Sequence, residues 1–221
     1  MQKFATPAPV SAVVDVAAGR IQVIAADRTD TVVEVRPADP AKSRDVRAAE
    51  QTAVEFADGV LRIRTADPKN QYFGPTGSVE VTVQLPAGSH LQAHTASCEL
   101  RGVGRLGDVV FEGAYRRSKI DEAASVRLTA VDGDVEIGRL GGPAQISTAR
   151  GSISVAEAVS GAVVLRTQMG DITVGAATGV SAALDAGTGH GCVSNALKND
   201  GTTAVDIRAT TGHGDITARS L

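Results

Sequence analysis

The most regular feature of the sequence is a pattern of short apolar strands and glycine turns that recurs five times between residues 126 and 218. In each pass a strand of alternating apolar and polar residues is followed by a glycine, and a second strand then begins with Ile or Val. Alternation of this kind favours half-buried β-strands. We expect the turn glycines to adopt positive φ, which glycine tolerates without steric cost. They are Gly133, Gly151, Gly170, Gly191 and Gly214.

Alignment of the inward residue of each strand extends the five passes to seven. The first strands contribute Ala93, Phe111, Leu128, Ile146, Leu165, Leu184 and Ile207, and the second strands contribute Leu100, Ile120, Val135, Ile153, Ile172, Val193 and Ile216. The second-strand residues are 15 to 23 positions apart, which is too short for helical repeats and fits one coil of a parallel β-solenoid. We therefore predict an all-β fold in which residues 89–221 form a parallel β-solenoid (β-helix or β-roll) of about seven coils.

This alignment makes two further predictions about the coils. The passes that end at Ile120, Val193 and Ile216 have two additional residues between the columns, which predicts extended turns at residues 115–119, 188–192 and 211–215. If each coil stacks on the one before it in sequence at ~4.8 Å, the outward residue before the second strand is never next to a like charge. These outward residues are Glu99, Lys119, Asp134, Ser152, Asp171, Cys192 and Asp215.

The N-terminal residues 1–88 carry different signals, and we expect them to cap the solenoid within one continuous domain. Residues 10–36 alternate as three strands, which predicts an antiparallel meander. Asp39 is suited to an N-cap and Pro40 to the first helical position, so a short helix is expected over residues 39–50. Ala57-Asp58-Gly59 lies between two apolar runs and predicts a hairpin.

Composition limits the partners and the compartment of the protein. The chain of 221 residues has 22 basic and 25 acidic side chains, and neither sign is concentrated in one half, so no strong field favours nucleic acid. No stretch of ~18 apolar residues predicts membrane insertion, and the N-terminus lacks the pattern of a signal peptide. We therefore expect a cytoplasmic protein. Cys98 and Cys192 fall about four coils apart, or ~20 Å, and should be free thiols.

One candidate site involves two identical tetrads, Thr-Gly-His-Gly, at residues 188–191 and 211–214. We expect His190 to stack on His213, with Cys192 and Asp215 beside them. Imidazole, thiolate and carboxylate groups bind zinc-like ions when they converge, so these four residues are candidate metal ligands. The alternative is a duplicated repeat whose histidines are simply solvated.

Two clusters are candidates for contact with a partner. Tyr72 and Phe73 are adjacent in a turn-rich stretch, where they either bind a partner or fold back over the core. The stretch containing Tyr115, Arg116, Arg117 and Lys119 is the only basic cluster; it could contact phosphate or an acidic partner, or form a solvated turn. No nucleophile elbow, P-loop, zincin or dinucleotide motif is present, so we expect neither catalysis nor a cofactor.

Several stretches resemble a bacterial family of putative adhesins, domain of unknown function 4097. The likeness includes residues 19–23 and 28–35, the hairpin at 57–59, residues 85–89 and repeated Thr-x-x-Gly-Asp-Ile/Val units such as residues 167–172. It covers about residues 10–221. The resemblance implies a β-solenoid without established function and supplies no catalytic residues.

The sequence thus predicts a non-catalytic scaffold or protein-interaction module. Self-association through an open solenoid end near Ser220 and Leu221 is expected, because exposed coil ends leave strand edges unpaired. Two other functions stay open: metal binding at the His190/His213 edge, and an adhesin-like or carbohydrate-binding role.

Overall fold

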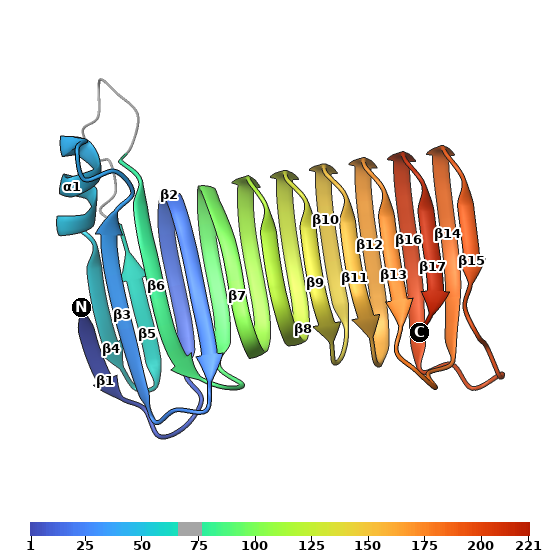
Figure 1. Ribbon diagram of the computed structural model, residues 1–221, viewed down its shortest axis with the longest axis horizontal. Coiled ribbons are helices and arrows are strands. Elements are labelled where there is room, and N and C mark those ends of the chain that lie inside the picture. Colours follow the sequence, from blue (N-terminus) through green and yellow to red (C-terminus); the bar gives the residue numbers. More distant parts are fainter. Residues whose placement is uncertain (66–76) are drawn as a thin grey trace.

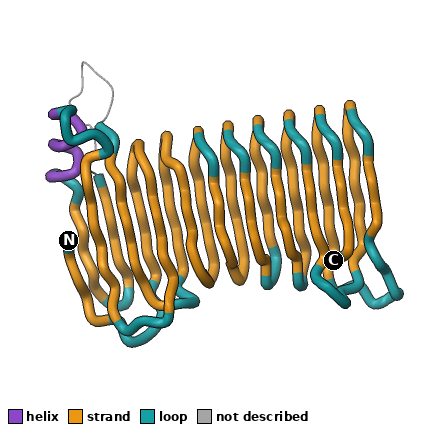
Figure 2. The backbone as a smooth tube through the Cα atoms, viewed as in Figure 1, coloured by secondary structure: helices purple, strands orange, loops and turns teal. Residues whose placement is uncertain are grey.

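The computed structural model describes residues 1–65 and 77–221 and shows a long stack of strands with one short helix at its N-terminal end (Figures 1 and 2). Tyr72 and Phe73, which were predicted to contact a partner or to fold over the core, lie outside the described residues. The helix is α1 (Ser43–Glu50). The strands of the N-terminal part are β1 (Gln2–Ala5), β2 (Ser11–Ala26), β3 (Asp30–Pro37), β4 (Ala53–Ala57), β5 (Val60–Arg64) and β6 (Val79–Pro86).

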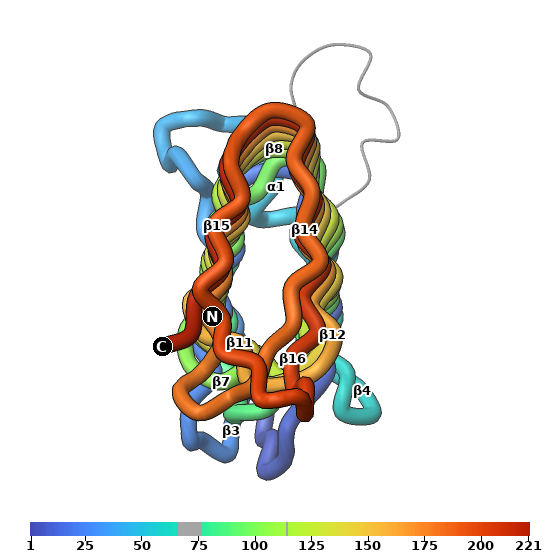
Figure 3. The backbone as a smooth tube through the Cα atoms, turned by 90° about the vertical axis from the view of Figure 1, so that its right-hand side faces the viewer, coloured from blue at the N-terminus to red at the C-terminus, as the bar shows by residue number. Residues whose placement is uncertain are grey.

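Strands of the remaining chain pair mainly in parallel. They are β7 (His90–Tyr115), β8 (Ser118–Asp132), β9 (Val135–Leu140), β10 (Ala144–Arg150), β11 (Ile153–Ala158), β12 (Gly161–Met169), β13 (Ile172–Ala176), β14 (Ala182–His190), β15 (Val193–Ala196), β16 (Val205–His213) and β17 (Ile216–Ser220). The first face of the stack carries β10, β12, β16 and β14, and the second face carries β9, β11, β13, β17 and β15. The long strands β2, β7 and β8 contribute to both faces. Figure 3 shows the chain winding around a narrow, elongated cross-section.

Apolar columns between the two faces form the core, as predicted. Leu128, Ile146 and Leu165 lie opposite one another on the first face, and each is fully buried. Val135, Ile153 and Ile172 form the matching column on the second face. Burial of such a side chain contributes ~1.5–3 kcal/mol, so these columns are a principal source of stability.

The repeated Thr-x-x-Gly-Asp-Ile unit closes each coil over the end of the core. We call the glycine turn a glycine arc, and the two strands it joins a rung. Thr167 Oγ1 donates a hydrogen bond to the Gly151 carbonyl at 3.0 Å, and Thr211 Oγ1 donates to the Gly170 carbonyl at 2.9 Å. The glycine itself turns the chain with positive φ, 126° at Gly151 and 148° at Gly170. The prediction of positive φ at all five turn glycines is confirmed.

The rungs do not stack in the order of the sequence. Strands β16 and β17 lie between β12–β13 and β14–β15, so the last rung of the chain occupies the next-to-last place in the stack (Figure 1). The prediction of sequential stacking is therefore wrong. The inward residues Ile207 and Ile216 of the inserted rung are fully buried. In contrast, β15 places Asn195 opposite Ala218. An amide buried there would lose its hydrogen bonds with water, so the more polar rung occupies the end of the stack.

The observed register also corrects the second-strand alignment. Ser118, not Ile120, lies opposite Val135, whereas Ile120 lies opposite Ile137. In the last two rungs it is the first strand that is shifted, because Ile207 lies opposite Val163 and not Leu165. At the glycine arcs Tyr115 pairs with Asp132, Met169 pairs with His213, and His213 pairs with His190, so these arcs have the same length. The predicted two-residue extensions at 115–119, 188–192 and 211–215 are therefore wrong. The two additional residues lie within the strands and not in the turns.

The N-terminal region joins the parallel stack through β2 and does not form the predicted antiparallel meander. Strand β2 pairs in parallel with β5, β6 and β7, and antiparallel pairing is confined to β1–β3, β3–β6 and β4–β5. The predicted hairpin is confirmed, with Asp58 at φ 52° and Gly59 at φ 75°. The helix begins at Ser43 and not near Asp39, because Asp39 accepts the Ala41 N–H in a preceding turn.

Candidate functional site

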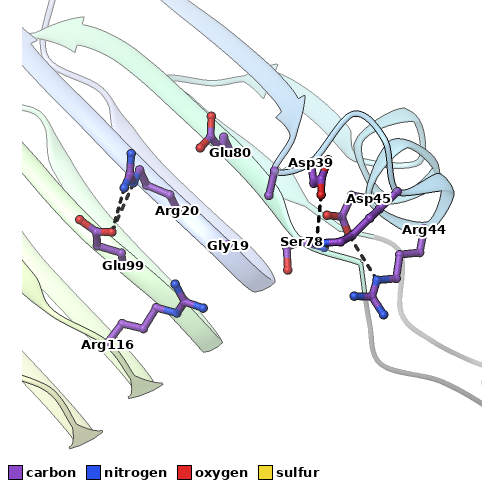
Figure 4. A pocket seen from close by; sticks show the side chains of 11 residues that line it. Gly19, Arg20, Asp39, Arg44, Asp45, Ser78, Glu80, Glu99 and Arg116 are labelled. Carbon is purple, nitrogen blue, oxygen red and sulfur yellow. Dashed lines mark hydrogen bonds and ion pairs between the residues drawn. The ribbon is translucent and has the colours of Figure 1, made fainter.

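A charged groove of about 410 Å³ lies between α1 and the arc that connects β7 to β8, where Arg116 stands in place of glycine. Its charged lining comes from five places that are far apart in sequence (Figure 4). The basic side chains are Arg20, Lys42, Arg44 and Arg116, and the acidic side chains are Asp39, Asp45, Glu80 and Glu99. Parallel pairing of β2 with β6 and β7 brings Arg20 between Glu80 and Glu99. The groove is therefore built by tertiary pairing, which no local motif in the sequence reveals.

Three of the four basic side chains in this charged groove form ion pairs with carboxylates of the protein. Arg20 Nη2 lies 3.2 Å from Glu99 Oε2, and Lys42 Nζ lies 3.0 Å from Asp39 Oδ2. The Lys42 ammonium and the Ala41 N–H together hold the pKa of Asp39 below its usual value. These exposed pairs contribute little stability, but they neutralise most of the positive charge.

Asp45 anchors the helix that forms one wall. Its carboxylate is buried and accepts a hydrogen bond from the Ser78 N–H at 3.0 Å. The Arg44 Nε atom lies 3.7 Å from the same carboxylate. A buried carboxylate requires such partners, so α1 is held firmly against the start of β6.

Arg116 is the unusual residue of the groove. It occupies the position in the arc at which later rungs have glycine. The Arg116 N–H donates to the Asp132 carbonyl at 2.9 Å, in the same way that the Gly133 N–H donates to the Arg150 carbonyl. Its φ of 124° lies in a region that side chains other than glycine rarely adopt. Within the described parts of the chain, no ion pair involves its guanidinium. Burial raises the pKa of the Cys98 thiol to about 12, and the nearby positive charge of Arg116 opposes that shift.

The rest of the predicted basic cluster points elsewhere. Arg117 and Lys119 both pair with Glu136 on the second face, Lys119 at 3.2 Å. The hydrogen bond with Glu136 raises the pKa of Arg117, and the same bond lowers the pKa of Glu136. Tyr115 is 52% exposed at the arc. The structure thus divides the cluster, and Arg116 alone reaches the groove.

A ladder of short polar side chains follows the glycine arcs along the stack. Asp134 Oδ1 accepts the Ser152 N–H, and Asp171 Oδ1 accepts the Asp215 N–H, both at 2.8 Å. Because the last two rungs are exchanged, Asp171 and Asp215 are neighbours, and the predicted separation of like charges is wrong. Each carboxylate is satisfied by a backbone donor of the next rung, and Arg117 occupies the place predicted for Lys119.

The two histidines of the repeated tetrads stack as predicted. The rings of His190 and His213 have centroids 4.6 Å apart and an interplanar angle of 15°. The lone pairs of imidazole lie in the ring plane, so two nearly parallel rings cannot both direct nitrogen at one ion ~2.0 Å away. Asp215 is already hydrogen-bonded to the Cys192 N–H at 2.8 Å. Among residues 1–65 and 77–221, no three His, Cys, Asp or Glu side chains are placed to hold a metal.

Sequence inspection missed a polar cluster on the first face. Ser125 Oγ donates to Asp108 Oδ1 at 2.6 Å, and His90 Nδ1 lies 3.3 Å from Asp108 Oδ2. The carboxylate stands between the hydroxyl and the imidazole, so the histidine cannot accept the serine proton as a general base would. The signal available in the sequence is the rung spacing, since His90 and Asp108 are 18 positions apart, as are His94 and Glu112.

Both cysteines are free, as predicted, Cys98 in the core and Cys192 at the surface. The described part of the chain contains no helix that is long and apolar enough to span a bilayer.

Comparisons with known proteins add only distant similarities. No protein-family model matches the chain, and no curated protein matches it. Similar solved structures include a putative cell adhesion protein from Clostridium sporogenes ATCC 15579, with 10% identity, a TM-score of 0.44, and coverage of 100% of this chain and 98% of that one. Putative adhesins from Bacteroides fragilis NCTC 9343 and Parabacteroides distasonis ATCC 8503 each share 15% identity, with TM-scores of 0.46 and 0.36 and coverage of 98% of this chain and 95% of theirs. These TM-scores are too low to assign a shared family, so the resemblance to domain of unknown function 4097 stays a prediction.

Proposed function

We propose that this chain is a non-catalytic β-solenoid that acts as a protein-interaction module, and that its charged groove binds an acidic segment of a partner protein. The observation that carries the proposal is Arg116, an arginine in a glycine conformation beside a charged groove. Unfavourable backbone conformations cluster at binding sites, where the side chain they present has a use.

The electrostatics of the groove support an anionic ligand. Arg20, Lys42 and Arg44 already face carboxylates of the protein, whereas the guanidinium of Arg116 has no such partner among the described residues. A guanidinium binds carboxylates through two parallel hydrogen bonds. The groove lining crosses neighbouring strands, from Glu99 through Arg20 to Glu80 and on to the residues around α1, which suits an extended peptide better than a compact ion.

The polar cluster of the first face also supports binding over catalysis. Its Ser125–Asp108–His90 order leaves the serine hydroxyl bonded to a carboxylate and without a neutral base. A scaffold needs only rigid surfaces, and the continuous columns of the stack provide them.

The proposal is tested by titrating a fluorescent oligoglutamate peptide with the protein and with two variants that remove one positive charge each. Arg116→Gln should weaken binding at least about tenfold, which corresponds to ~1.4 kcal/mol. Arg166→Gln is the matched control, because Arg166 is also exposed but lies on β12 of the first face. Equal weakening by both variants would show only nonspecific attraction and reject the groove.

The adhesin-like and carbohydrate-binding alternatives have a separate readout. Glycan-array binding that survives Arg116→Gln, together with no peptide binding, would replace the present proposal with a carbohydrate-binding one.

A further inference from the structure

The rung formed by β14 and β15 leaves a strand edge open on both faces of the stack. β14 pairs with β16, and β15 pairs with β17; among the strands that the structure describes, neither has a partner on its other side. Figure 3 shows the two strands at the end of the stack, on opposite sides of the narrow cross-section. The Ala182 N–H at the start of β14 donates to the Lys198 carbonyl at 3.0 Å, and the outer backbone N–H and C=O groups beyond it can pair with another chain.

The apolar interior is also incompletely covered at this end, where Leu197 of the segment after β15 packs against the core. Val193 is 46% exposed, although its neighbour Ile216 in the next rung is fully buried. Leu184 is half-buried, whereas its neighbour Ile207 is fully buried. The columns of the core thus end in Val193 and Leu184, which we call the apolar lip, between the two open strands.

The opposite end of the stack is protected. It ends in the short antiparallel strands β1 and β4, of four and five residues, and α1 packs against β3. Lys3 lies on one of these edges and Glu55 on the other. By contrast, β14 and β15 contain no Lys, Arg or Pro, and Asp185 is their only formal charge. Natural edge strands normally use charge, proline or shortness to prevent pairing. β15 is as short as β1, but the nine residues of β14 have almost none of these protections.

A second copy of the chain fits this surface better than a single peptide. An extended peptide adds to one sheet edge and leaves the second edge and the apolar lip exposed. The same rung of a second copy presents two edges at the same separation, with a matching lip. A two-fold axis brings the nine-residue β14 against an antiparallel strand of equal length, and the resulting contact is closed.

We infer that two copies of this chain dock tail to tail through the rung of residues 182–196. The contact joins both faces of the two stacks and covers Val193 and Leu184. It leaves the charged groove at the far end of each copy free, so the dimer presents two peptide-binding grooves at opposite ends. The pairing site itself does not depend on the proposed groove ligand.

The test is sedimentation velocity of the full chain over a wide concentration range. The wild-type mass should double with concentration and then stop rising. Val193→Lys places a charge at the apolar lip and should weaken the dimer at least about tenfold, or ~1.4 kcal/mol. Val131→Lys is the matched control, because Val131 is 44% exposed but lies on β8 in the middle of the stack, and this variant should dimerise as wild type does.

Hydrogen exchange provides a second readout that does not depend on a variant. Amides of β14 and β15 should gain protection as concentration rises, while those of β1 and β4 should not. A mass that stays monomeric, a mass that grows without limit, or equal dimerisation of Val193→Lys would each overturn the inference. Arg116→Gln should leave dimerisation unchanged, so failure of the groove proposal and failure of this one are separable.

Discussion

Replacement of Arg116 by glycine should make the protein more stable. Arg116 has φ 124° at a position where the following rungs have Gly133, Gly151 and Gly170. Holding a side chain in such a conformation costs ~1–3 kcal/mol. Glycine removes that strain but loses more conformational entropy on folding, at ~0.5–1 kcal/mol. No ion pair within the described residues is lost, so the expected net gain is ~0.5–2 kcal/mol.

Thermal unfolding measures this gain directly. For a chain of this length, ~1 kcal/mol raises Tm by ~2–4 °C, so Arg116→Gly should melt a few degrees above wild type. Arg116→Lys keeps both the Cβ atom and the charge and should show no gain, which separates backbone strain from charge. Gly133→Ala is the reverse experiment, because a Cβ there would lie 2.2 Å from the Arg116 carbonyl oxygen, and this variant should be clearly destabilised. An Arg116→Gly protein that melts at or below the wild-type temperature would refute the strain argument.

Three further outcomes are expected. Leu165→Ala should cost ~2–5 kcal/mol in urea unfolding because it opens a cavity in a fully buried column, whereas Leu184→Ala, in the half-buried terminal rung, should cost clearly less; equal losses would contradict the observed rung order. A thiol reagent should modify Cys192 alone in the native protein and both cysteines after denaturation, since burial raises the pKa of Cys98 to about 12; rapid reaction of both would contradict the packing. The Arg28 and Lys3 side chains lower the pKa of Asp30 to about 2, so its contribution to stability is present above the unfolded pKa of ~3.9 and is lost as the pH falls toward ~2. Asp30→Asn should therefore lose less stability than wild type between about pH 4 and pH 2, as urea midpoints will show, and an unchanged pH dependence would contradict this assignment.

The repeat chemistry was readable from the sequence because it is local. Thr167, Gly170, Asp171 and Ile172 each perform one task within a single turn: a hydroxyl for the neighbouring glycine carbonyl, a positive φ, an acceptor for the next N–H, and a core side chain. The hairpin at Asp58 and Gly59 was predictable for the same reason. Such residues act within a few positions of one another, so their spacing carries the information.

The candidate site was not readable in the same way. Arg116 was identified as one member of a basic cluster, but its neighbours Arg117 and Lys119 bind Glu136 on the other side of the arc. The groove requires β2 to lie between β6 and β7, and these three segments have no common motif. Which of several adjacent cations is free depends on where carboxylates from distant strands arrive.

The sequence by itself determined the type of strand, the position of the glycine arcs and the apolar columns, because alternation and φ preference are properties of single residues and their immediate neighbours. Only the tertiary structure decided the order of the rungs and which end is open. Pairing energies of rungs with nearly identical arcs differ little, so burial decides between them: Ile207 and Ile216 are placed inside, and the rung with Asn195 and an exposed Val193 is placed at the end. That choice exposes β14 and β15, and it depends on contacts between whole strands that no short stretch of the sequence contains.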